Sequence, residues 1–570
     1  MNSSSAIGPT WIGVVLAGLS SWSAAGALGQ EPDMPAQGQL VKRTYVSSID
    51  GAAIDYALWL PPGQGDRPDE AWPLIVFLHG SGEGKDWEAP TSINASVPVL
   101  GARSEIPFIV VFPLMRGSWS INSLAERDVL ETIADVQTHF VVDPDRVHLV
   151  GLSLGGFAGW RLACRYPHLW ASATLFCGGG EPDLAVNLRH VPVRVYHGAR
   201  DPIVPVEQSR DMVAALRKAD IPVQYIEIPE GKHNIWSDPL SGKELYGWIG
   251  LQRRVGRPRR IGFRTHTLRH QRAYWASIES MIDPAAPAFV DVFVPPGESR
   301  VFVHTENVGH LVLDPPAEFF GNAGTSPFVV NNQQVAGTQT DRGWSIRLPG
   351  GAEGERIKRR GLSGPIQDVL FDSFVVSVAN PTDAERNRAW AAAADQAFDW
   401  TNRLTAGDVP MIPADQVTQE LMQRSHLICI GDTTDHPLLA DLVGKVPLHA
   451  EAGRVYLDGQ PLAESLAAFV MIYPNPLVPD RYIVICSGRP GAVGRLAGMA
   501  LTPPYLNPEP VEDVILLRRD GELLPWTDAP EVARDASPKG ERLRPRGPVF
   551  DSAWRLPAAA RQRLQGADSP

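Results

Sequence analysis

The sequence predicts an α/β protein in which a large open-sheet domain precedes a small β domain and a second, smaller α/β domain. Short apolar runs typical of buried strands, such as Trp72 to Leu78 and Val147 to Val150, alternate with helix-like segments in the first part of the chain. From Phe289 onward, apolar and polar residues alternate with period 2, which indicates strands with one buried face. After Thr382, helix-like and strand-like segments alternate again, as in a small α/β domain.

A chain of 570 residues is too long for one hydrophobic core, so several domains are expected. The first 29 residues contain a short apolar stretch followed by small residues, which is typical of a secretory signal peptide, although no Lys or Arg precedes Trp11. The expected order is a signal peptide (1–29), the large α/β domain (38–252), an Arg-rich linker (253–272), a β-rich, sandwich-like domain (273–380), a small α/β domain (381–528) and a partly disordered tail (529–570).

The most informative motif is Gly151-Leu152-Ser153-Leu154-Gly155, which follows the strand-like run Val147 to Val150. A helix-like segment rich in small residues comes directly after it and ends before Pro167. Strand, sharp turn and helix in this order form a nucleophile elbow, in which small neighbours let the serine hydroxyl project above the sheet. Ser153 is therefore the candidate nucleophile, and an ordinary turn serine is the alternative.

A serine nucleophile needs a histidine to take its proton and a carboxylate to orient that histidine. Asp201 follows a strand-like run that ends near Tyr196, and His233 follows another that ends near Ile228, so both stand at carboxyl ends of strands. The order Ser, Asp, His is the one that this architecture requires. Glu181 is the alternative acid, and a helix cap is the alternative role for Asp201.

Backbone N–H groups near the elbow are candidates for an oxyanion hole. One would come from the turn at Gly80 and Ser81, after the strand-like run Trp72 to Leu78, and the other from Leu154 next to the nucleophile. Trp119 and Trp236 are candidates for the wall of the substrate pocket, with burial in the core as the alternative. His79 and His197 are expected to shape their loops, and His148 to pack within its strand.

Several of these motifs together resemble a known superfamily. The segment from about Arg43 to Gly250 is similar to the α/β-hydrolases, through Leu78-His79-Gly80, the elbow, His197-Gly198 with Asp201, and His233. It resembles the branch of polyhydroxybutyrate depolymerases and feruloyl esterases, and also the catalytic domain of prolyl oligopeptidases. Further motifs lie in the later part of the chain: Thr267-Leu268-Arg269 with Tyr274-Trp275, Thr305-Glu306-Asn307-Val308, Gly364-Pro365-Ile366-Gln367-Asp368 and Ile472-Tyr473-Pro474-Asn475-Pro476. Through them, nearly the whole chain resembles large secreted hydrolases from planctomycete-type bacteria, but that resemblance implies no defined activity for the C-terminal half.

Composition narrows the functions that remain. A net charge of −12 argues against nucleic-acid binding, and no segment after the leader is long and apolar enough to suggest an integral membrane protein. No zinc or calcium motif appears, and Gly80 to Lys85 lacks the spacing of a phosphate-binding loop, so neither a metal nor another cofactor is expected. Four cysteines permit disulfides but do not indicate a disulfide-built scaffold.

The sequence thus predicts a secreted or periplasmic serine hydrolase that cleaves carboxylic esters, with acylated polysaccharide or another bulky ester as substrate. A peptidase of the prolyl-oligopeptidase type is the nearest alternative, because esters and amides are cleaved by the same groups. A hydrolase fold without activity that presents the C-terminal domains to a glycan or cell wall is the alternative of a different class.

Overall fold

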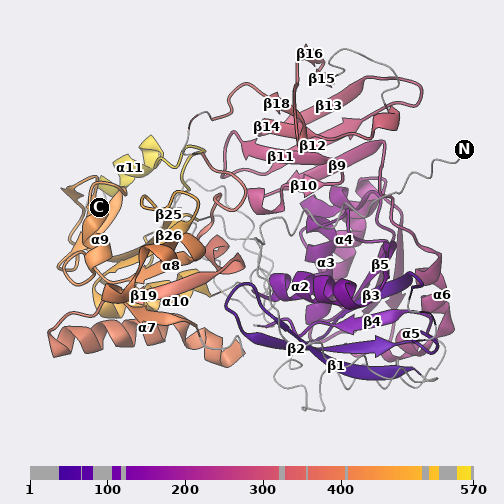
Figure 1. The fold of residues 1–570 in the computed structure, drawn as a ribbon, viewed down its shortest axis with the longest axis horizontal. Coiled ribbons are helices and arrows are strands. Elements are labelled where there is room, and N and C mark those ends of the chain that lie inside the picture. The colour runs from indigo at the N-terminus through magenta and orange to yellow at the C-terminus, as the bar shows by residue number, and fades with distance from the viewer. Residues whose placement is uncertain are drawn as a thin grey trace, which may run out of the picture.

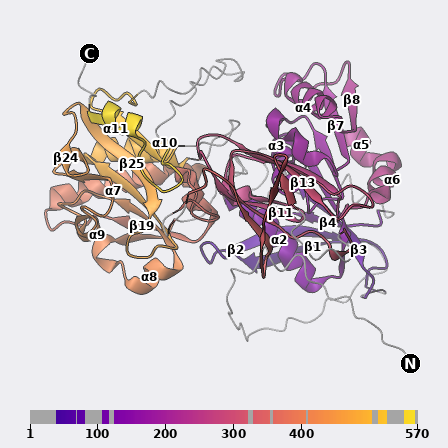
Figure 2. The ribbon, with the colours of Figure 1, turned by 90° about the horizontal axis from the view of Figure 1, so that it is seen from above.

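The computed structural model describes residues 38–65, 67, 69–80, 106–116, 124–319, 328–352, 354, 357–404, 409–502, 512–524 and 549–565. These residues form three units, which are coloured purple (first), pink (second) and orange to yellow (third) in Figure 1. The first and second units pack together, and the third unit lies beside them. Figure 2 shows the same arrangement from above. The expected signal peptide (1–29) lies outside the described residues.

The first unit is built on an eight-stranded sheet with the order β1-β2-β4-β3-β5-β6-β7-β8. The six strands β4, β3, β5, β6, β7 and β8 run parallel to their neighbours in the sheet. Strand β2 pairs antiparallel with β4, and β1 pairs antiparallel with β2 at the edge. Strand β3 is buried along its whole length, as expected for a parallel sheet covered on both faces. The strands are β1 (Gln39–Val46), β2 (Ala53–Leu60), β3 (Trp72–Leu78), β4 (Ile109–Phe112), β5 (Val142–Leu152), β6 (Ser172–Phe176), β7 (Val193–Gly198) and β8 (Val223–Ile228).

Helices cover the two faces of this sheet and bury two separate apolar clusters. One face packs against α2 (Leu124–His139), α3 (Leu154–Arg165), α4 (Glu207–Lys218) and the 3-10 helix η1 (Pro182–Leu188). The other face packs against α5 (Ser237–Ser241) and α6 (Lys243–Leu251). This is the α/β-hydrolase arrangement, and it confirms the predicted fold class.

The second unit is a sandwich of two five-stranded sheets, with orders β10-β11-β14-β18-β17 and β16-β15-β13-β12-β9. Buried and less buried residues alternate along β12, so the predicted period of 2 reflects one face turned to the sandwich core. The strands are β9 (Arg260–Thr265), β10 (Arg272–Ala273), β11 (Ala276–Met281), β12 (Ala288–Phe293), β13 (Val301–Glu306), β14 (Val308–Leu313), β15 (Phe328–Val330), β16 (Gln333–Val335), β17 (Thr338–Thr340) and β18 (Gly343–Arg347).

The Arg-rich segment 253–272, expected to be a solvated linker, forms strand or 3-10 helix over half of its length. Residues Arg260–Thr265 form β9, which pairs with β12, and Arg272 begins β10. Its arginines form ion pairs with carboxylates from all three units, including Asp145, Asp291 and Asp368. Much of the positive charge of this segment is therefore paired with carboxylates, several pairs lying at the surface, and the sandwich begins at Arg260.

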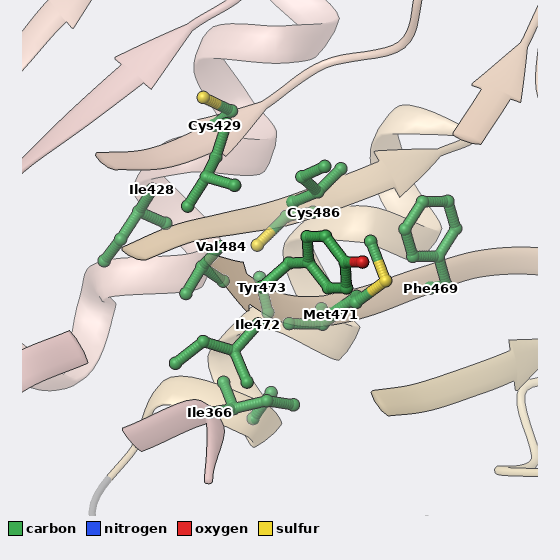
Figure 3. Packing of buried hydrophobic residues seen from close by; sticks show 14 of the residues in the cluster. Ile366, Ile428, Cys429, Phe469, Met471, Ile472, Tyr473, Val484 and Cys486 are labelled. Carbon is green, nitrogen blue, oxygen red and sulfur yellow. The ribbon is translucent and has the colours of Figure 1, made fainter. Parts of the chain in front are cut away.

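The third unit contains a six-stranded mixed sheet with the order β20-β19-β21-β26-β25-β27 and a small three-stranded sheet β22-β23-β24. Its core packs apolar residues around the free cysteines Cys429 and Cys486, which Figure 3 shows on neighbouring strands. The elements are β19 (Phe374–Val378), α7 (Ala384–Leu404), β20 (Met411–Pro413), α8 (Gln419–Arg424), β21 (His426–Ile430), α9 (Pro437–Asp441), β22 (Leu448–Glu451), β23 (Arg454–Leu457), β24 (Gln460–Pro461), β25 (Leu466–Pro474), β26 (Tyr482–Gly488), α10 (Pro490–Leu501) and β27 (Val514–Arg518).

Two expected boundaries of this unit differ from the structure. Strand β19 lies before residue 381 and pairs with β21, and the 3-10 helix η4 (Ile366–Phe371) is buried in the same core. Part of the tail, expected to be partly disordered, is also ordered: Phe550 and Trp554 are buried, and α11 (Ala558–Gln565) follows them. These apolar anchors tie residues 549–565 to the core. No helix among the described residues has the length and apolarity needed to cross a bilayer.

Candidate active site

Ser153 stands at the turn between β5 and α3, at the carboxyl edge of the large sheet. Its backbone has φ 54° and ψ −117°, a conformation that L-residues rarely adopt. The Ser153 N–H donates to the carbonyl of Phe176 on β6, and the Ser153 carbonyl accepts from Phe157 in the first turn of α3. The strained turn is thus held from both sides, which is the geometry of a nucleophile elbow.

The glycines around Ser153 are required by close backbone contacts. A Cβ at Gly151 would lie 2.1 Å from the carbonyl oxygen of Gly155, and a Cβ at Gly155 would lie 2.1 Å from that of Leu78. Both distances are far inside van der Waals contact, so α3 can approach β5 and β3 this closely only without side chains at these two positions. The crowding explains why small residues flank the serine.

The structure brings Ser153, His233 and Asp201 together in one hydrogen-bonded chain. His233 Nε2 lies 2.9 Å from Ser153 Oγ, and His233 Nδ1 lies 2.7 Å from Asp201 Oδ2. The Asp201 side chain is fully buried, whereas that of His233 retains 15% exposure. These are the distances and the order of contacts by which a carboxylate orients an imidazole toward a hydroxyl.

Asp201 is held by its own loop. Its Oδ1 accepts hydrogen bonds from the backbone N–H groups of Ile203 (2.8 Å) and Val204 (2.9 Å). Burial raises the pKa of Asp201, but the hydrogen bonds from His233, Val204 and Ile203 outweigh burial and hold that pKa below its usual value. Asp201 is therefore ionised at neutral pH, and it does not cap α4, which begins later, at Glu207.

The loops that carry Asp201 and His233 are fastened to each other. Ala199 N–H donates to the carbonyl of Ile228, and Arg200 N–H donates to that of Gly231. A Cβ at Gly198 would lie 2.2 Å from the carbonyl oxygen of Lys232, so this glycine permits the close approach. The spacing between acid and base is thus fixed by the backbone.

His197 lies beneath the acid and braces its loop. Its Nε2 is 3.0 Å from the carbonyl oxygen of Val204 and 3.4 Å from Asp201 Oδ2, and its Nδ1 is 2.7 Å from Ser209 Oγ. Burial lowers the pKa of His197. The expectation that His197 shapes its loop is confirmed. Its contact with Asp201 was not anticipated, although the spacing His197 to Asp201 on one loop could have suggested it.

The candidate oxyanion donors belong to two segments next to Ser153, the start of α3 and the end of β3. Leu154 is the first residue of α3, where backbone N–H groups have no partner within the helix. Gly80 follows β3 and lies close to Ser153: a Cβ built on Gly80 would be 3.7 Å from Ser153 Cβ. Ser81 lies outside the described residues. His79 contacts the carbonyl oxygens of Gly80 and Leu114 at 2.8 and 2.7 Å, as expected for a histidine that shapes this turn.

Of the two candidate pocket tryptophans, Trp236 lies against the site. Its ring meets that of His233 nearly at a right angle, with 5.3 Å between ring centroids. This contact restrains the imidazole. Trp119 lies outside the described residues.

Glu181, the alternative acid, is placed elsewhere. It precedes η1, and its carboxylate lies 3.9 Å from His266 Nε2 at the border with the sandwich. His148 packs within β5 beside Ser172 Oγ (2.9 Å), as expected for a structural histidine. Asp201 is thus the carboxylate in contact with His233.

One residue near the site was not singled out from the sequence. Cys177 follows β6 directly and is fully buried, and its thiol donates to the carbonyl of His233 at a distance of 3.3 Å. Its position at the carboxyl end of a strand, the same edge that carries Ser153 and Asp201, was the available signal. All four cysteines are free and buried.

Comparisons with known proteins agree with this architecture. Residues 75–323 match the model of the alpha/beta hydrolase family. The match covers less than half of the chain, begins within β3 and extends into the sandwich. It confirms the predicted α/β-hydrolase fold of the first unit and the resemblance of that segment to this superfamily.

Among curated proteins, the chain is similar to NocK of Nocardia uniformis subsp. tsuyamanensis, provisionally named an esterase, with 27% identity over 176 residues. The match covers 28% of this chain and 48% of NocK, so the chain spans about half the length of that relative.

Among solved structures, a thermostable esterase matches with 28% identity and a TM-score of 0.35, covering 38% of this chain and 63% of the esterase. A ferulic acid esterase matches with 17% identity and a TM-score of 0.32, covering 38% of this chain and 98% of that enzyme. An acylaminoacyl peptidase of Pyrococcus horikoshii matches with 15% identity and a TM-score of 0.30, covering 37% of this chain and 41% of the peptidase.

Proposed function

We propose that the protein is a serine hydrolase that cleaves carboxylic esters through Ser153, His233 and Asp201. The observation that carries the proposal is the unbroken chain from Ser153 Oγ to His233 (2.9 Å) and on to Asp201 (2.7 Å), set on a strained turn. A serine that served only the fold would need neither a positioned imidazole nor a buried carboxylate behind it.

In the first half of the reaction, Ser153 Oγ attacks the ester carbonyl while His233 Nε2 takes the hydroxyl proton. Asp201 keeps the remaining ring proton on Nδ1 and stabilises the imidazolium that forms. His233 then gives the proton to the departing alcohol, which leaves an acyl group on Ser153. Water hydrolyses this acyl-enzyme by the same proton route in reverse.

Negative charge develops on the carbonyl oxygen in each tetrahedral intermediate. The N–H of Leu154 and one from the Gly80–Ser81 turn are the proposed donors to this oxygen. A donor of this kind contributes about 3 kcal/mol to the stability of the transition state. The strain at Ser153 serves this purpose, because it directs the hydroxyl toward the carbonyl that the two N–H groups hold.

The proposed substrate is a bulky ester, such as one carried by an acylated polysaccharide, met outside the cytoplasm. Support comes from the segment between β6 and β7, where hydrolases of this fold often carry a lid. Here η1 has 7 residues and packs on the sandwich, where Asn187 Nδ2 donates to the carbonyl of Arg264. Between β6 and β7, this short, fastened segment provides little chain that could cover the site.

Two other functions give different experimental results. A peptidase would use the same three side chains but would cleave amides, including proline-containing peptides. A binding protein that kept only the fold would hydrolyse neither class of bond.

The test is a panel of aryl acetates, feruloylated sugars and proline-containing peptides, assayed with the full chain and with Ser153→Ala. We expect ester hydrolysis that Ser153→Ala abolishes, and little or no peptide cleavage. Hydrolysis of short esters without release of acyl groups from any polymer would remove the proposal about bulky substrates. Cleavage of peptides in preference to esters would favour the peptidase.

A further inference from the structure

The thiol of Cys177 lies behind the catalytic histidine and acid. Its Sγ is a hydrogen-bond donor to the His233 carbonyl at 3.3 Å, and Cys177 is fully buried. As the donor of this hydrogen bond, the thiol is protonated in the resting protein. The proposed ester hydrolysis makes no use of a thiol at this position.

Three different metal-binding atoms meet here. One ligand atom from each of Cys177, Asp201 and His233 lies within 4.8 Å of the other two. Thiolate, carboxylate and imidazole are the three ligand types of zinc sites, with bonds of about 2.3, 2.1 and 2.0 Å. A tetrahedral ion with such bonds separates its ligand atoms by roughly 3.4 Å. The existing spacing thus needs only small side-chain movements.

The charges also suit a divalent cation. A Cys177 thiolate and the Asp201 carboxylate would supply two negative charges against the two positive charges of the ion, and a neutral His233 would add none. The bound group as a whole would be neutral, so its burial would carry little electrostatic cost. His233, with its side chain 15% exposed, is the member of the three through which an ion would enter from the solvent side.

We propose that Cys177, Asp201 and His233 form an inhibitory site for a soft divalent cation such as Zn²⁺, which binds only by taking the catalytic triad apart. The ion would be held by Cys177 Sγ, an Asp201 carboxylate oxygen and His233 Nδ1, with water as the fourth ligand. The inhibitory part of this inference rests on the proposed function, and the binding part does not.

The protons account for the inhibition. The S–H bond of Cys177 breaks, the sulfur binds the ion, and one proton leaves to solvent. Nδ1 of His233 can bind the ion only without its proton, so the ring proton moves to Nε2. Nε2 then faces Ser153 Oγ as a donor and cannot take the proton of the nucleophile. The carboxylate of Asp201 exchanges its bond to the imidazole for a bond to the ion.

The kinetic test measures ester hydrolysis by the full chain over a range of free Zn²⁺, each variant being compared with its own metal-free rate. Cys177→Ser keeps a hydroxyl donor for the His233 carbonyl but removes the soft ligand. We expect Zn²⁺ to inhibit the wild-type protein, and we expect Cys177→Ser to raise the inhibition constant at least about tenfold, as loss of even a supporting partner does at metal sites.

Two control variants separate this site from other causes. Cys164→Ala removes a buried thiol of the same domain on α3. His266→Ala removes the imidazole from the other described group of three metal-binding side chains, which also includes Glu181 and Asp183. Both controls should be inhibited by Zn²⁺ like the wild-type protein. Equal inhibition of wild type and Cys177→Ser, or no inhibition of the wild type, would overturn the proposal.

A spectroscopic test remains valid even if the protein hydrolyses no ester. Co²⁺ can replace Zn²⁺ and gives a thiolate-to-metal charge-transfer absorption when a cysteine binds it. We expect this absorption in the wild type and in both controls, together with release of one proton per ion, and its loss in Cys177→Ser. Absence of the band in the wild type would overturn the site, whereas its presence without ester hydrolysis would contradict only the proposed function.

Discussion

Replacing Asp201 by Asn tests whether this carboxylate orients His233 for the proposed reaction. In the wild-type protein, the N–H groups of Ile203 and Val204 donate to Asp201 Oδ1 at 2.8 and 2.9 Å. The carbonyl oxygen of the Asn side chain can accept the same two hydrogen bonds. The amide NH₂ then takes the place of Oδ2, which lies 2.7 Å from His233 Nδ1. Because NH₂ can only donate, Nδ1 must accept, and the ring proton moves to Nε2, where it faces Ser153.

The expected cost follows from that wrong tautomer. A loss of the general base by this route lowers kcat by about 10⁴-fold, which corresponds to roughly 5.4 kcal/mol in the activation free energy. The assay is kcat and KM for an aryl acetate, with the melting temperature as a check on folding. KM should change little, since the substitution leaves the proposed donors at Leu154 and in the Gly80–Ser81 turn in place.

The matched control for this experiment is Glu181→Gln. Glu181 is the other acid that the sequence offered, and in the structure its carboxylate lies near His266. We expect Glu181→Gln to leave kcat unchanged. If Asp201→Asn retained kcat within about tenfold of wild type, or if Glu181→Gln caused the larger loss, the assignment of Asp201 as the orienting acid would be wrong.

Two further substitutions test packing and buried charge. Glu126→Gln should lower stability by about 3–5 kcal/mol, because it leaves Arg165 and His270 buried without their carboxylate. Burial raises the pKa of Glu126, but His270 and Arg165 lower it by more, so that its pKa in the folded protein lies below the usual value. The carboxylate therefore stabilises the fold above about pH 4.3, the pKa of an unperturbed Glu. Below that pH, the difference in melting temperature between Glu126→Gln and wild type should shrink. Gly155→Ala should abolish activity and cost roughly 1–3 kcal/mol or more, since its Cβ would lie 2.1 Å from the Leu78 carbonyl; an active, stable variant in thermal unfolding would contradict the crowding argument.

The catalytic domain was largely predictable because its signals are local. Parallel strands buried on both faces are continuous apolar runs, as in Trp72 to Leu78, and each candidate catalytic residue follows such a run. Since the carboxyl ends of parallel strands share one edge, the order Ser153, Asp201, His233 along the chain was enough to predict their meeting.

Charged and mixed segments were harder to interpret, because their partners are distant in sequence. The arginines between 253 and 272 suggested solvent exposure, but Arg254 pairs with Asp145 and Arg269 with Asp368. Such pairs depend on how whole domains pack, which residue type alone does not encode. The polar tail likewise concealed Phe550 and Trp554, whose burial ties it to the third unit.

The position of Cys177 shows the same limit at atomic scale. Cys177 directly follows β6, and His233 follows β8, with β7 between these two strands in the sheet. The loop after β8 reaches Cys177 past the end of β7, and the hydrogen bonds from Ala199 and Arg200 fasten it to the loop after β7. No pattern within either segment predicts that contact.

The most direct test of the central claim is covalent labelling of the full chain by a fluorophosphonate, read out by intact mass and peptide mapping. Because only a serine activated by its histidine reacts readily with this reagent, we predict a single adduct per chain, located on Ser153 and absent from Ser153→Ala. A wild-type protein that stays unlabelled, or one labelled on another residue, would contradict the assignment of Ser153, His233 and Asp201 as a working catalytic triad.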